Sequence, residues 1–313
     1  MATPAAKKPA GRRGRTPSRT PRGRRPTPGA LDRVAGGRIT KHESPRPSHA
    51  DSSYLEEGSS RLDDVEREME ADRYEEMMEE KKLFPGSEEW SPDEERLFQL
   101  LFMRQYIPLM PPHWSVDFRG IPLPKILFAT SEVDRAVIYS QSERDFRATK
   151  AIIRLIDLTA SVRAFVQTNQ KAKIPGYMKK ELDQYVRWAA LDGHYEHPHE
   201  LPNLIVEVVD MSIGGAGITD YIQARLRGLA EQHRTFWRET PERPPVLYGL
   251  FIVNTTLLVL TVDPSKGEEA HVSYQVEVNF NQRNQGVWNA ITVAIVVCLA
   301  RDDMITRKQY FGK

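Results

Sequence analysis

The chain has 313 residues, enough for one or two domains, and its formal net charge of +1 conceals three regions of different composition. Residues 1–50 carry 13 Lys and Arg against two acids, residues 51–95 carry 5 against 18, and residues 96–313 carry 26 against 23. A single cysteine excludes an intrachain disulfide, and the longest apolar stretch, residues 287–300, is too short to span a bilayer. We therefore expect a reducing compartment, no membrane association, and three regions: a disordered basic tail (1–55), an acidic helical or linker segment (56–90) and a folded domain (91–313).

The basic tail is rich in Arg, Pro, Gly, Ser and Thr, which cannot bury enough apolar surface to offset the entropy of ordering the chain. Clustered arginines bind polyanions and serve as nuclear import signals. The tail therefore predicts a nuclear protein that contacts nucleic acid or chromatin through Arg12, Arg13, Arg15, Arg24 and Arg25. The alternatives are a tail that only maintains solubility and a cytoplasmic location.

The acidic segment has a thin apolar stripe at helical spacing, formed by Leu62, Val65, Met69 and Met77. Three interpretations remain open. Residues 60–82 could form a helix that binds a protein partner, an acidic segment that folds back on the basic tail, or a solvated charged helix that makes no specific contact.

The folded domain begins with a well-marked helix. Ser91 is the expected N-cap, Pro92 occupies the first helical position and Glu94 completes a capping box. Prolines predict an irregular segment next, followed by a short strand at 135–140. A long helix follows over 142–169, and its expected buried stripe contains Phe146, Ile153, Ile156, Ala160 and Val166, widened by Ile152, Leu155 and Val162.

The second half of the domain alternates between strands and helices. Residues 175–191 predict a helix, 201–210 a strand, 214–217 ("GGAG") a flexible connection, and 219–239 a helix with Thr219 as N-cap. Two strands meet at a hairpin turn around 254–256, a further strand lies in 270–282, and 286–305 is apolar on nearly all sides, typical of a buried helix. This order predicts an α+β (α/β-like) domain with a mixed central sheet flanked by helices.

The strand "LPNLIVEVVD" (201–210) carries a carboxylate, Glu207, in an otherwise aliphatic run. Strand alternation places Glu207 on one face with Ile205 and Val209. An unpaired ionised Glu would be costly there. Glu207 is therefore expected to pair with an arginine from the following helix or to bind a metal.

Asp192 in "WAALDG", Glu207 15 residues later, and the helix and strands that follow resemble the core of the PD-(D/E)XK nuclease-like superfamily, in the version found in fungal proteins with basic tails. The resemblance covers residues 140–300 and implies a restriction-endonuclease-like fold. It also implies a site in which Asp192 and Glu207 are catalytic and hold Mg²⁺, while the lysine of an E-x-K motif helps to activate water. Here Val209 stands at the lysine position, and the nearest substitutes are Arg225 and Arg227, which do not deprotonate. The resemblance thus predicts a degenerate site, with no cofactor unless the enzyme is active.

Several other groups have candidate roles. Four-residue steps place donors for phosphates on one helical ridge, with a solvated face as the alternative: Gln223, Arg227, Arg234 and Arg238. The segment 192–200 holds three histidines and three acids but matches no standard zinc spacing, and we expect a polar surface loop. His233 is expected to be a hydrogen-bonded core histidine and Cys298 an inert buried thiol.

Three functions therefore follow from the sequence. The first is a nuclear nucleic-acid- or chromatin-associated protein with an inactive nuclease-like domain. The second is an active Mg²⁺-dependent nuclease that uses Asp192 and Glu207. The third is a protein-interaction scaffold without a nucleic-acid role, which the acidic segment would serve.

Overall fold

The computed structural model describes residues 72–131, 136–195 and 201–310. The chain divides into two units, residues 1–57 and 58–313, and every described residue belongs to the second. The predicted basic tail with its five candidate arginines, and residues 56–71 of the acidic segment, lie outside the described residues.

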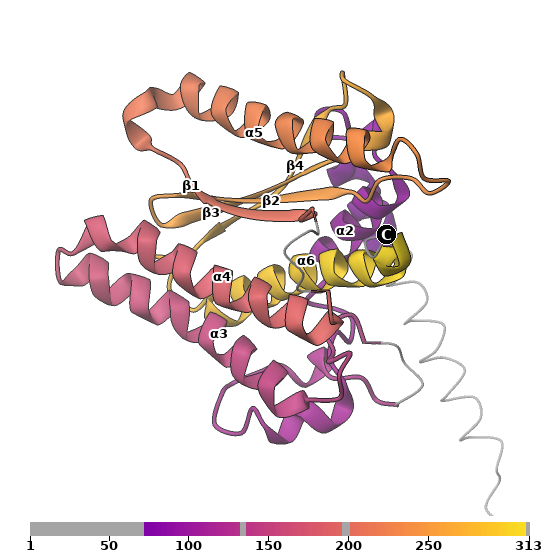
Figure 1. Ribbon diagram of the computed structural model, residues 1–313. Helices are drawn as coiled ribbons and strands as arrows, with labels where there is room; N and C mark the ends of the chain where they lie inside the picture. Colours follow the sequence, from indigo (N-terminus) through magenta and orange to yellow (C-terminus); the bar gives the residue numbers. More distant parts are fainter. Residues whose placement is uncertain (1–71, 132–135, 196–200, 311–313) are drawn as a thin grey trace, which may run out of the picture. The chain divides into compact units, whose positions relative to one another are not determined.

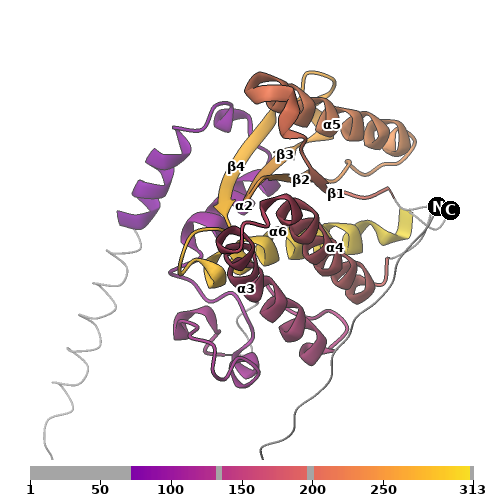
Figure 2. The same cartoon turned by 90° about the vertical axis from the view of Figure 1, so that its left-hand side faces the viewer.

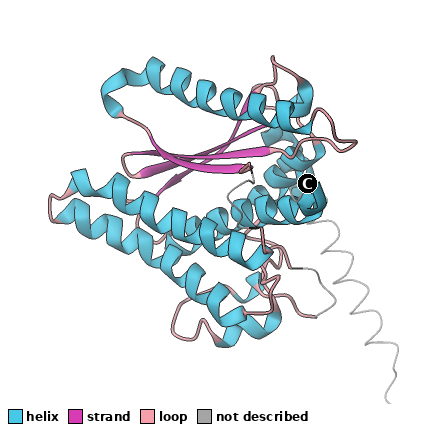
Figure 3. Cartoon of the chain, in the orientation of Figure 1, coloured by secondary structure: helices cyan, strands magenta, loops and turns pink. Residues whose placement is uncertain are grey.

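A four-stranded mixed sheet forms the centre of the domain (Figure 3). The strands are β1 (Leu204–Val208), β2 (Leu247–Val253), β3 (Thr256–Val262) and β4 (Val272–Asn279), and they lie side by side in chain order. β1 and β2 are parallel, because helix α5 (Gly214–Trp237) crosses between them, whereas β2, β3 and β4 are joined as antiparallel neighbours. The predicted hairpin at residues 254–256 is therefore confirmed.

Helices cover both faces of this sheet (Figure 1). α3 (Asp145–Gln167), α4 (Ile174–Gly193) and α6 (Gly286–Arg307) lie on one face, and α5 lies alone on the other. The prediction of an α+β domain with a mixed sheet flanked by helices is confirmed.

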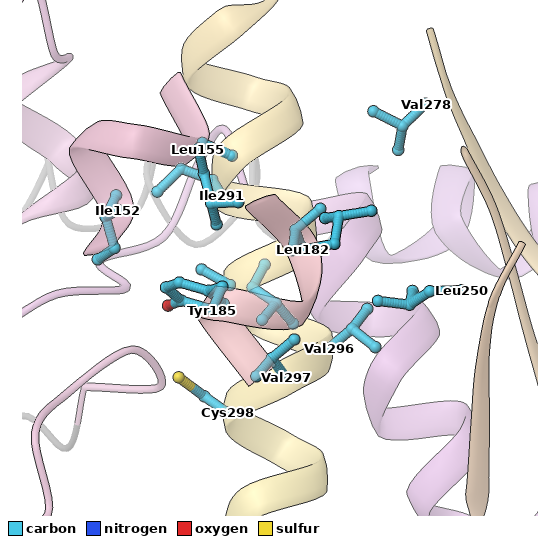
Figure 4. Packing of buried hydrophobic residues seen from close by; sticks show 14 of the residues in the cluster. Ile152, Leu155, Leu182, Tyr185, Leu250, Val278, Ile291, Val296, Val297 and Cys298 are labelled. Carbon is cyan, nitrogen blue, oxygen red and sulfur yellow. The ribbon is translucent and has the colours of Figure 1, made fainter. Parts of the chain in front are cut away.

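α6 is the centre of the larger core. Its buried side chains run without interruption from Asn289 to Arg301, so the helix is enclosed on all sides, as its composition predicted. Figure 4 shows Ile291 and Val297 of this helix among side chains of α3, α4, β2 and β4. Cys298 is buried in this cluster, as predicted, and burial raises the pKa of its thiol to about 11. In the described part of the chain, no helix combines the length and apolar character needed to cross a membrane.

The opposite face of the sheet packs against α5 through a smaller core. Ile222, Leu226 and Leu229 of α5 belong to this cluster together with Phe251 of β2. The helix comes close to the sheet at Gly249, where an added Cβ would lie 3.1 Å from Leu226 Cδ2 and would overlap the Phe251 ring. A glycine is required here because a larger residue would push α5 away from β2.

α2 (Pro92–Met103) begins as the sequence predicted, with Ser91 as N-cap and Glu94 closing a capping box. Residues 72–81 of the acidic segment are also helical, and Met77 is buried in a small cluster with Trp90 and Phe98. Figure 2 shows this helix on the β4 side of the domain. The Met77 side of the predicted partner-binding stripe is therefore occupied by the protein's own body.

Three local predictions are wrong. Residues 136–140 of the predicted short strand are irregular, although Ile138 N–H donates to the Leu109 carbonyl at 2.8 Å. Residues 214–217 form the first turn of α5, so the helix begins at Gly214 and not after Thr219. Phe146 and Ala160 are not part of the buried stripe of α3, because both are exposed, Phe146 to 65%. The buried side of that helix contains Ala148, Ile152, Leu155, Thr159 and Val162.

Candidate functional site

Glu207 lies on the α5 face of β1, as strand alternation predicted, since Ile205 and Val209 pack into the α5 cluster. Arg225 from α5 donates from Nε to Glu207 Oε1 at 2.8 Å and to Oε2 at 3.0 Å, and its Nη2 contacts Oε1 as well. The Tyr221 hydroxyl donates to Oε2 at 2.8 Å. Of the two expected roles for this carboxylate, the structure therefore shows pairing with an arginine of the following helix.

This pairing fixes the charge state of Glu207. The hydrogen bonds from Arg225, assisted by Tyr221, lower the pKa of Glu207 against the opposing effect of partial burial. The carboxylate is thus ionised and neutralised at neutral pH. Val209 is 2% exposed and contributes only methyl groups where an E-x-K lysine would stand. Arg225 and Tyr221 hold both Glu207 oxygens, and neither can serve as a general base at neutral pH.

Asp192 lies at the C-terminal end of α4 and is 4% exposed. Its carboxylate accepts hydrogen bonds from Ser140 Oγ at 2.9 Å, Gln141 N–H at 2.7 Å, and the N–H and hydroxyl of Ser142 at 3.1 and 2.6 Å. Arg301 Nη1 of α6 lies 2.8 Å from Asp192 Oδ2. Burial acts to raise the pKa of Asp192, but the hydrogen bonds from Ser142, Gln141 and Ser140 outweigh it, and the pKa is lowered.

Arg301 is fully buried and holds three parts of the fold together. Besides Asp192, Nη1 donates to the Tyr139 carbonyl at 2.7 Å, and Nε and Nη2 donate to Asp302 Oδ1 at 3.0 and 2.9 Å. Its Cζ lies 4.4 Å from the centre of the Tyr139 ring. Burial alone would lower the pKa of Arg301, but electrostatic interactions with Cys298 and Asp302 raise it. The Asp192–Arg301 pair therefore joins α4 and α6 to the segment that precedes α3.

The structure does not bring Asp192 and Glu207 together. Asp192 is bound by the segment before α3 and by Arg301 of α6, whereas Glu207 is bound by Tyr221 and Arg225 of α5. The two helices that supply these arginines, α6 and α5, lie on opposite faces of the sheet (Figure 1). Within residues 72–131, 136–195 and 201–310, no group of three or more His, Cys, Asp or Glu side chains is placed to hold a metal ion. The residues that the nuclease resemblance assigns to Mg²⁺ do not fit that ion, because each carboxylate is already engaged by an arginine on its own side of the sheet.

The predicted donor ridge on α5 is only partly open. Arg227 and Arg238 are exposed, Gln223 is half-buried, and Arg234 donates from Nη1 to the Gly267 carbonyl at 3.0 Å. Arg234 therefore anchors the loop after β3. Two exposed arginines remain of the predicted ridge.

The two predictions about histidines have different outcomes. His233 is 0% exposed, and its Nε2 lies 3.1 Å from the Pro202 carbonyl, which confirms a hydrogen-bonded core histidine. Burial lowers its pKa to about 4. His194 ends α4 in the left-handed conformation, and the other two histidines of the predicted surface loop, at 197 and 199, lie outside the described residues.

The structure reveals a basic groove between α3 and α4 that the sequence analysis missed. Two adjoining hollows of about 260 and 320 Å³ share Arg147, Arg154, Gln184 and Trp188 in their walls. The signal is present in "RDFRATKAIIR" as basic residues at steps of three and four, beside the apolar stripe of the same helix. The sequence of α3 therefore carries a basic face beside its buried one.

Comparison with known proteins does not place this chain in a family. The chain matches no protein-family profile, no curated protein and no solved structure. The function must therefore be argued from the residues themselves.

Proposed function

We propose that this chain is a nuclear, nucleic-acid- or chromatin-associated protein whose folded body is a PD-(D/E)XK nuclease-like, restriction-endonuclease-like core that has lost cleavage. The observation that supports the loss is the separate neutralisation of the two candidate carboxylates: Arg225 holds Glu207 and Arg301 holds Asp192, on opposite faces of the sheet. Hydrolysis of a phosphodiester by this superfamily needs carboxylates that share a metal ion. The body thus retains a core without its reaction.

Nucleic-acid association is supported by the segregation of charge. Residues 1–50 carry a net charge of +11, from 13 basic residues and two acids. Basic side chains that displace counterions from phosphates give binding that weakens steeply with salt. The folded body adds a run of exposed basic side chains along α3. The same basic tail is the feature that would direct the protein to the nucleus.

The direct test is equilibrium binding of the full chain to fluorescently labelled DNA and RNA over a range of salt concentrations. We expect binding whose logarithm falls linearly with the logarithm of salt concentration. Neutralising the thirteen Lys and Arg residues of 1–50 by glutamine, hereafter the tail-neutral variant, should weaken it markedly. Absence of binding by the unmodified full chain at about 50 mM salt, where such contacts are strong, would reject the proposal and leave the scaffold interpretation.

A further inference from the structure

The groove between α3 and α4 gathers cations along one wall. Arg147, Lys150 and Arg154 follow one another at steps of three and four residues on α3, with Arg144 just before the helix, and Arg187 of α4 lines the same groove. Side chains at this spacing lie on one face of a helix. The groove therefore presents a row of positive charge about as long as three turns of helix, roughly 15 Å.

These α3 cations are not neutralised by the protein. Within the described residues, no carboxylate forms an ion pair with Arg144, Arg147, Lys150 or Arg154. Arg154 donates only to the neutral Gln184 amide oxygen, at 3.2 Å. Two carboxylates line the groove. Glu181 is one, and the other, Asp192, is already paired with Arg301. The row is thus available to an anionic ligand.

Aromatic side chains lie among these cations. Phe146 is 65% exposed, which is unusual for a phenylalanine, and the Lys150 ammonium lies 5.4 Å from the centre of its ring. Trp188 is half-buried in the wall shared by both hollows. Its ring is supported by Tyr185, with 5.0 Å between ring centres, and by Arg301, whose Cζ is 6.0 Å away. Trp188 is therefore a rigid surface, whereas Phe146 is free to adapt.

We propose that this groove binds single-stranded nucleic acid, with phosphates on the α3 cations and unpaired bases stacked on Phe146 and Trp188. Grooves that combine a line of positive charge with aromatic rings bind single strands without strong sequence preference, because every base has a π-face and every nucleotide a phosphate. In a duplex the faces of the bases are covered by their neighbours, so only the phosphates could contact the row. The inference rests on the proposed nucleic-acid association and gives it a ligand class and a place in the folded body.

The test compares two matched arginine pairs in the tail-neutral variant, so that the tail does not hide the groove. One double variant carries Arg147→Gln and Arg154→Gln, and the other carries Arg227→Gln and Arg238→Gln on the exposed face of α5. The two pairs remove the same charge from opposite faces of the sheet. Binding to a labelled oligothymidylate is followed by fluorescence anisotropy across salt, and thermal unfolding checks that both variants remain folded.

We expect the α3 pair to weaken single-strand binding by about tenfold or more and to make the slope of log K against log salt shallower by about 1.4, since each single-strand phosphate contact contributes about 0.7. The α5 pair should change binding by less than about twofold, because Arg227 and Arg238 do not line the groove. Equal loss in both variants would overturn the proposal, since it would show attraction to net charge and not to this groove.

Phe146→Ala tests the stacking contribution separately, because it removes an exposed ring and no charge. We expect at least a fivefold loss of oligothymidylate binding, with an unchanged salt slope and unchanged binding to a duplex of the same length. Unchanged single-strand binding, or an equal loss with the duplex, would overturn the assignment of single strands. If the full chain binds but the tail-neutral variant does not, the groove proposal fails while the proposed function stands. If neither binds, both fail.

Discussion

Because Asp192 and Arg301 form a buried ion pair, we expect the single substitution Asp192→Ala to lower the free energy of unfolding substantially. The Asp192 side chain is 2% exposed and that of Arg301 is 0% exposed, so removing the carboxylate leaves a cation in the core with one counter-charge fewer. Loss of one partner of a buried ion pair costs about 3–5 kcal/mol. Asp302 stays within 3.0 Å of Arg301 and limits that cost, whereas the backbone N–H groups of Gln141 and Ser142 lose their acceptor and add to it.

Thermal and urea unfolding of the full chain measure this effect. A loss of about 3–5 kcal/mol lowers the unfolding temperature by roughly 6–20 °C for a domain of this size. Asp183→Ala is the matched control on the same helix, because its carboxylate is 48% exposed and pairs with Lys179 four residues away. That control should change the free energy of unfolding by about 0.5 kcal/mol or less.

Replacing both partners at once distinguishes a structural role of the Asp192–Arg301 pair from a functional one. The double variant Asp192→Leu with Arg301→Met should recover part of the lost stability, because apolar residues of similar volume can replace a buried ion pair. An Asp192→Ala variant as stable as the unmodified chain would refute the reasoning. It would mean that the buried pair adds no net stability and that the carboxylate has another role, such as binding a ligand.

The remaining predictions concern single groups whose environments differ. Glu207→Gln should lower the free energy of unfolding in urea at pH 7 by less than about 1 kcal/mol, since Arg225 is 45% exposed. Because the pKa of Glu207 is lowered, the contribution of its carboxylate to stability should vanish as the pH falls through that pKa. A loss above about 2 kcal/mol would contradict a surface ion pair. His233 has a pKa lowered from 6.5 to about 4, so the unfolded state takes up a proton first. Relative to His233→Gln, the unmodified chain should lose about 3 kcal/mol of stability between pH 7.5 and 4, at about 1.4 kcal/mol per unit, and a pH-independent difference would refute this. The pH dependence that Asp303 gives to stability has the opposite sign. Burial raises its pKa to about 6, so its ionisation destabilises the fold as the pH rises through 6. The free energy of unfolding of Asp303→Asn, relative to that of the unmodified chain, should therefore be higher at pH 7.5 than at pH 4.5. Ser91→Ala removes the capping box of α2 and should cost about 1 kcal/mol by urea unfolding, with no change expected only if the cap is redundant.

Local signals in the sequence predicted the parts of the fold that local physics controls. Ser91 and Glu94 predicted the start of α2, because a capping box involves residues three apart. Period-two alternation predicted which face of β1 carries Glu207, and the composition of 286–305 predicted a fully enclosed helix. Each of these features is determined by neighbours within a few residues in the chain.

The sequence could not predict what depends on distant residues. Asp192 and Arg301 are 109 positions apart, and nothing near either residue indicates that they meet. The glycines at 214–217 favour a connection by propensity, yet packing of α5 on the sheet makes them helical. Phe146 has the residue type of a core position, but only the packing of α3 against α4 and α6 decides which side of the helix is buried. The basic groove became visible once that side was known.

The most direct test of the central claim measures binding and cleavage in the same sample. The full chain is incubated with end-labelled single-stranded and double-stranded DNA and RNA in Mg²⁺ or Mn²⁺, and bound and shortened fractions are read together for the unmodified chain and Glu207→Ala. The account predicts retained, full-length nucleic acid with both proteins, since Glu207 and Asp192 serve ion pairs on opposite faces of the sheet. Metal-dependent shortening that disappears with Glu207→Ala would contradict it.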